Sequence, residues 1–142
     1  MNAESIVVSL DMAKQLAKAG WPQEESYLAW FTMQNGKTSE VHRNVGNLLP
    51  IDFAAPTAEE ILRRLPGYVL DKGITYGLRV EKLNPLQIFD RTGENQEYMW
   101  KMDYYRIRDN IELCPPSPPV TGTNLANAAA AMWCYLSEND LL

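Results

Sequence analysis

The densest group of residues with binding chemistry lies between positions 98 and 108, where aromatic and cationic side chains follow one another. Tyr98, Trp100 and Tyr104 alternate with charged positions, and Arg106 and Arg108 come directly after them. On a sheet that binds single-stranded nucleic acid, exposed aromatic rings stack on bases and nearby arginines hold phosphates. The competing interpretation packs the same aromatic side chains under helices, and the net charge of −5 favours it. These five residues form the candidate binding surface.

The sequence offers few groups for metal or nucleophilic chemistry. His42 is the one histidine, and Cys114 and Cys134 are the two cysteines. This set is too small for a structural zinc site within one chain, so we expect no metal and no cofactor. A Cys–His nucleophile pair with His42 stays open, but no local motif supports it. A small hydrolase is a separate, weaker alternative, for which the sequence names no nucleophile and no metal site.

The motifs of the large enzyme classes are missing from the sequence. It contains no glycine-rich phosphate loop and no serine flanked by glycines in the nucleophile-elbow pattern. Glu24-Glu25 and Glu59-Glu60 are adjacent carboxylates, and adjacency does not supply the spacing that glycoside hydrolysis needs. We therefore expect no catalytic residues and a non-enzymatic protein.

Three segments carry the start and stop signals of helices. Apolar residues recur at helical spacing from position 10 to 19, with Ser9 as the N-cap and Gly20 at the end. Thr57 and Glu60 have the spacing of a capping box and predict a short helix of about two turns that closes at Pro66-Gly67. An alanine-rich helix follows from about position 125, capped by Thr123 or Asn124 and ended by Asn139.

The strand signals lie between these helices. Residues 27–34 are rich in aromatic side chains and lead into Asn35-Gly36, which predicts a tight turn and a weak returning strand near 40–42. Residues 74–81 alternate with period two, 86–89 form a shorter run, and 98–104 alternate again, so we expect a meander. The phase slips after Tyr104, which predicts a bulge near Tyr104–Tyr105. The proline-rich segment 114–119 predicts an extended strap.

Length and composition indicate one soluble domain. The chain has 142 residues, 46% of them hydrophobic and 22% charged, and its acidity comes mainly from the two ends. The N-terminus lacks the basic start of a signal peptide, and the longest weakly polar run, 125–136, is too short to span a bilayer. We therefore expect a single domain over residues 1–142, a cytoplasmic location and no membrane contact.

Three segments together carry a resemblance to a known group of proteins. Residues 10–22 form a helix followed by glycine, an aromatic residue and proline; residues 54–66 contain Ala-Pro-Thr-x-x-Glu and end in Leu-Pro; residues 126–139 are rich in alanine and end in Glu-Asn. In this order they resemble small uncharacterised proteins encoded by bacteriophages and by bacterial genomes that carry prophages. The resemblance covers about a third of the chain. It implies a location in a bacterial host cell and no catalytic residues.

These observations predict an α+β domain in which three helices pack on one face of an antiparallel sheet of four to five strands. The leading hypothesis is a non-enzymatic accessory protein of phage or prophage type that acts through a protein partner or through self-association. The alternative is a single-stranded nucleic-acid-associated protein that uses the aromatic and arginine residues of 98–108. The burial of Trp100 and Tyr104 distinguishes the two, because base stacking requires exposed rings.

Overall fold

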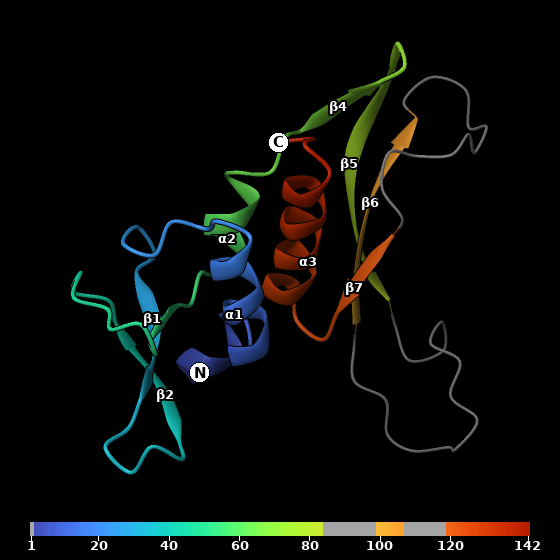
Figure 1. The fold of residues 1–142 in the computed structure, drawn as a ribbon. Helices are drawn as coiled ribbons and strands as arrows, with labels where there is room; N and C mark the ends of the chain where they lie inside the picture. The colour runs from blue at the N-terminus through green and yellow to red at the C-terminus, as the bar shows by residue number, and fades with distance from the viewer. Residues whose placement is uncertain (1, 84–98, 107–118) are drawn as a thin grey trace.

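The computed structural model describes residues 2–83, 99–106 and 119–142, which form three α-helices, a short 3₁₀ helix and seven strands (Figure 1). The helices are η1 (Ala3–Ser5), α1 (Leu10–Lys18), α2 (Ala58–Leu62) and α3 (Leu125–Glu138). The strands are β1 (Leu28–Thr32), β2 (Ser39–Arg43), β3 (Phe53–Ala54), β4 (Tyr68–Asp71), β5 (Ile74–Leu83), β6 (Met99–Arg106) and β7 (Val120–Gly122). The run predicted at 86–89 and nearly all of the predicted strap at 114–119 lie outside the described residues.

Local capping chemistry starts α1 and α2 where the sequence predicts them, although α2 ends at Leu62, before the predicted close at Pro66-Gly67. The Ser9 hydroxyl accepts a hydrogen bond from the Met12 N–H at 3.2 Å and starts α1, and Gly20 follows its end with a φ of 99°. In α2, the side chains of Thr57 and Glu60 each accept a hydrogen bond from the other residue's backbone N–H, which completes the predicted capping box. Because side chains satisfy backbone groups that a helix leaves unpaired, these ends are fixed locally.

The strands form two antiparallel sheets, so the α+β class is confirmed while the predicted single sheet is divided. One sheet has the order β2-β1-β3 and the other the order β4-β5-β6-β7. The chain leaves β3 after two residues and enters α2 through Ala55-Pro56, which ends the first sheet. In Figure 1 the helices lie between the two sheets, with α3 next to β6 and β7.

The register of β6 is continuous, and the predicted bulge at Tyr104–Tyr105 is wrong. Residues Met99 to Arg106 pair one to one with Leu83 to Tyr76 of β5. Met102 and Tyr104 are buried on the side of α3, and Tyr105 lies on the opposite face and is exposed. The apparent phase slip in the sequence is therefore an aromatic residue on the outer face, and the backbone alternation is intact.

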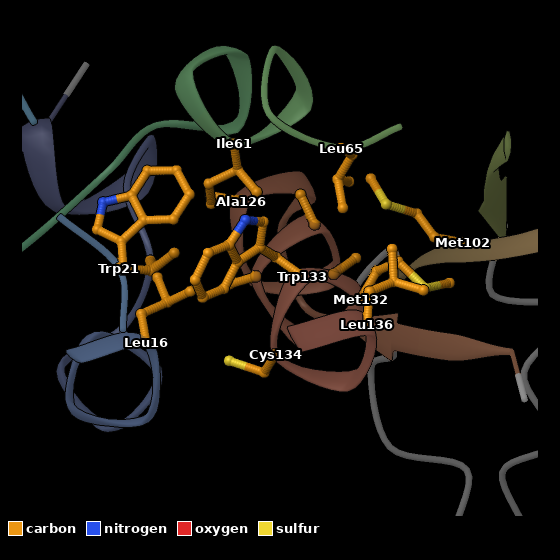
Figure 2. Packing of buried hydrophobic residues seen from close by; sticks show 14 of the residues in the cluster. Leu16, Trp21, Ile61, Leu65, Met102, Ala126, Met132, Trp133, Cys134 and Leu136 are labelled. Atoms are coloured by element: carbon orange, nitrogen blue, oxygen red, sulfur yellow. The ribbon is translucent and has the colours of Figure 1, made fainter. Parts of the chain in front are cut away.

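The core centres on α3, which is buried on nearly all sides. Ala126, Ala128, Ala129 and Ala130 are each at most 1% exposed. Figure 2 shows Trp133 on the side of Trp21, Leu16 and Ile61, while Met132 and Leu136 lie toward Met102 of β6. The Trp21 and Trp133 rings meet edge to face with centroids 5.2 Å apart. Small alanine side chains let this helix approach its neighbours closely on several sides.

Polar contacts attach the start of α3 to the N-terminal segment. The Asn124 side chain caps α3 by accepting from the Asn127 N–H at 2.7 Å, and its amide donates to the Val7 carbonyl at 3.0 Å. The Asn127 side chain accepts from the Ser9 N–H at 2.8 Å. Of the two residues that the sequence offers as the N-cap of this helix, Thr123 and Asn124, the structure uses Asn124. Among the described helices, none has the length and apolar character needed to cross a membrane.

Candidate functional site

Tyr104 belongs to the core and is not an exposed stacking residue. Its side chain is 1% exposed, and its hydroxyl donates a hydrogen bond to the Pro66 carbonyl at 2.7 Å. Burial raises the pKa of the Tyr104 hydroxyl to about 12, because the charged form loses its hydration. This placement follows the competing interpretation of the sequence, in which the aromatic face of the strand packs under helices.

Trp100 lies at the margin of the same core. It is half-buried and packs against the core residues, and the Lys82 Nζ atom lies 5.5 Å from the centroid of its ring. A cation at this distance over an indole face is a favourable contact within the protein. The inner face of β6 therefore uses both of its described aromatic residues for packing.

Three of the five predicted residues, Trp100, Tyr104 and Arg106, lie in the part of the chain that the structure describes. Arg106 is the last residue of β6, and its backbone pairs with Tyr76. Tyr98 and Arg108 lie outside the described residues. Of the aromatic residues in the prediction, Tyr104 is enclosed and Trp100 is half-buried, so the described part of the strand offers no row of exposed rings on its inner face.

The opposite face of the same sheet carries exposed apolar side chains that the sequence analysis did not single out. Tyr68, Gly77 and Tyr105 are direct neighbours across β4, β5 and β6. Since directly paired residues point to the same face, the two tyrosines flank the glycine on the side away from α3. Leu70, two residues further along β4, points to the same face. We call Tyr68, Leu70 and Tyr105 the outer patch; they are 68%, 70% and 43% exposed.

An ion pair on this face lies beside Tyr105. Arg79 donates from Nε to Asp103 Oδ1 at 2.9 Å and from Nη2 to Oδ2 at 2.5 Å. The hydrogen bond to Asp103 raises the pKa of Arg79, and the Arg79 Cζ atom lies 5.4 Å from the centroid of the Tyr105 ring. A bidentate pair of this geometry fixes the plane of the guanidinium. The outer patch is therefore bordered by a pre-ordered polar group.

The sequence did carry a signal for β4. Asp71-Lys72-Gly73-Ile74 is a two-residue hairpin turn in which Lys72 and Gly73 have φ angles of 50° and 79°. Tyr68, Val69 and Leu70 are all apolar, however, so no alternation marks which of them faces outward.

The other candidates for chemistry lie apart from each other. His42 is exposed on β2, with Nε2 2.9 Å from Glu40 Oε2. Cys134 is buried in α3, and burial followed by the charge of Glu138 raises the pKa of its thiol to about 11. Cys114 lies outside the described residues. The described residues contain no group of three or more His, Cys, Asp or Glu side chains arranged to hold a metal ion.

Comparison with known proteins gives no match. No protein-family model, no curated protein and no solved structure matches this chain. The resemblance of residues 10–22, 54–66 and 126–139 to phage and prophage proteins therefore stays a prediction.

Proposed function

We propose that the protein is a non-enzymatic accessory protein of phage or prophage type that binds another protein through the outer patch. The observation that carries the proposal is the exposure of Tyr68 and Leu70 on β4, which is an edge strand of its sheet among the described residues. Edge strands offer unpaired backbone groups, and proteins usually protect them with charges, prolines or a covering segment. On β4, by contrast, two large apolar side chains are each more than two thirds exposed. Such exposed apolar side chains suit contact with the surface of a partner.

The composition of the patch also suits a protein ligand. Tyrosine is enriched at protein interfaces, because its ring buries a large area and its hydroxyl keeps a polar contact. The Arg79–Asp103 pair beside Tyr105 supplies a polar margin next to the apolar centre. A bacterial host cytoplasm is the compartment that the proposal implies.

Affinity capture with matched variants tests the proposal. Tyr68→Thr/Leu70→Thr removes the apolar area and places β-branched residues, which suit a strand, at both positions. Val45→Thr/Leu49→Thr is the control, since both of its residues are exposed apolar side chains outside this sheet. We expect one host protein to be retained by the wild type and the control and lost by the patch variant, and to bind again when purified.

Two results would contradict the proposal. The first is a partner that the patch variant retains as strongly as the wild type. The second is saturable, salt-sensitive binding of a single-stranded oligonucleotide at low salt, which the nucleic-acid alternative predicts.

A further inference from the structure

Strand β2 forms one edge of the first sheet, and its outer side is free of strands in the described part of the chain. The Asn44 N–H donates to the Tyr27 carbonyl at 2.9 Å, so by antiparallel alternation the backbone groups of His42 and Glu40 also face β1. The backbone groups that point away from β1 belong to Ser39, Val41 and Arg43. The nearby η1 makes its backbone hydrogen bonds within itself, from Ser5 to Asn2 and from Ile6 to Ala3.

The side chains of this edge have alternating chemistry. Glu40 and His42 share one face, with side chains 53% and 58% exposed and Nε2 2.9 Å from Oε2. Val41, between them, lies on the other face and is half-buried. The edge therefore presents an acid, an apolar residue and a base in a short, regular stretch.

This order is complementary to itself. When two copies of β2 run antiparallel about Val41, Ser39 lies opposite Arg43 and the outward backbone groups form the hydrogen-bonded pairs. Glu40 then lies opposite His42 of the second copy in a non-hydrogen-bonded pair, where side chains approach most closely. Centring the pairing on Ser39 or on Arg43 instead keeps the backbone bonds but places no Glu opposite a His.

We propose that two copies of the chain pair antiparallel through β2, centred on Val41, in a two-fold dimer whose two Glu40 and two His42 side chains alternate on one face. The proposal goes beyond the function proposed above, because it uses a different strand on a different sheet. It joins two three-stranded sheets into one of six strands and removes an open edge from each copy.

The contact is short, which sets its expected strength. Stable interfaces bury at least about 1,200 Å² in total, and five paired residues on each copy bury less than that. We therefore expect a weak, concentration-dependent dimer, with dissociation constants on the order of 10 to 500 μM.

Sedimentation velocity from about 5 μM to 1 mM, analysed as a monomer–dimer equilibrium, tests the proposal with charge variants. His42→Glu places like charges opposite one another in two symmetric pairs and should weaken the dimer about tenfold. Glu40→Lys/His42→Glu reverses the order of the charges and should restore it. Val41→Pro removes an outward N–H that β1 does not use and should abolish dimerisation.

Two control variants test whether the effects on dimerisation belong to β2. Glu59→Lys/Arg63→Glu reverses an exposed ion pair on α2 and should leave the dimer unchanged. Tyr68→Thr/Leu70→Thr should do the same, which separates this contact from the outer patch. A chain that stays monomeric at 1 mM, a charge-reversed variant no stronger than His42→Glu, or a dimer lost only with the β4 variant would overturn the proposal. Thermal unfolding of each variant checks that it is folded.

Discussion

Gly122 is the position where the structure leaves least room for a side chain, and its replacement by alanine gives a sharp test of the core. Gly122 ends β7, directly before the turn into α3. A Cβ atom placed there would lie 2.9 Å from Asn127 C and 3.0 Å from Ala128 Cα, and closer still to Ala128 N. All three are backbone atoms of α3, so no side chain can rotate to make space.

The expected cost of Gly122→Ala follows from this geometry. The φ angle of Gly122 is not positive, so alanine can adopt its backbone conformation. The penalty is therefore steric. Overpacking costs about 1–3 kcal/mol when side chains can adjust. Here β7 and the first turn of α3 must move apart, which disrupts the packing of Ala126 and Ala128. We therefore expect the free energy of unfolding to fall by about 3 kcal/mol or more. For a chain of this length that lowers the Tm by roughly 10 °C.

Urea unfolding followed by tryptophan fluorescence measures the effect, and Gly67→Ala is the matched control. Nothing lies within 4 Å of a Cβ at Gly67, and its φ is not positive. Alanine there should change the free energy of unfolding by less than about 1 kcal/mol, with stabilisation expected from the loss of unfolded-state entropy. An unchanged midpoint for Gly122→Ala, or an equal loss for Gly67→Ala, would refute the close approach of β7 and α3.

Three further predictions concern other parts of the fold. Because the pKa of the Cys134 thiol rises from 9.0 to about 11 on folding, the unfolded state ionises first, and stability should fall between about pH 9 and 11 by up to about 2–3 kcal/mol. The loss in Cys134→Ala over the same range should be smaller by that amount, and what remains above about pH 10 reflects the raised pKa of Tyr104. Asp140, with a φ of 54° after the end of α3, should be replaced favourably by glycine, and chemical denaturation should show a gain of about 1 kcal/mol. Tyr104→Phe leaves the Pro66 carbonyl without its donor and should cost about 1–2 kcal/mol, whereas an unchanged midpoint would mean that the hydrogen bond contributes nothing net.

The helices were predictable because their signals are local. Ser9, Thr57 and Glu60 each act within four residues of their own position, and they make the contacts that their spacing predicts. The division of the strands into two sheets depends instead on where α3 inserts, and that is a contact between segments far apart in the sequence. No local sequence pattern near β3 or β7 indicates this contact, which is why neither strand was predicted.

The candidate site was predictable only in part, for a reason that Tyr104 and Tyr105 illustrate. Adjacent tyrosines on a strand must point to opposite faces, so one of them is exposed whichever way the strand packs. The sequence does not say which, and the bulge interpretation placed both on the apolar side. Tyr68 and Leu70 posed the same problem, because Val69 between them is also apolar and hides the alternation.

The distribution of exposed apolar residues supports the proposed placement of a binding surface on the strands and not on the helices. In the described part of the chain, none of the exposed large apolar side chains lies on α1, α2 or α3. The buried faces of these helices pack between the two sheets, so a change there acts first on stability. Tyr68 and Leu70 lie outside that packing, and their replacement should alter the free energy of unfolding by less than about 0.5 kcal/mol while changing binding. A function carried by the outer patch is therefore separable from folding, whereas a function carried by Tyr104 would not be.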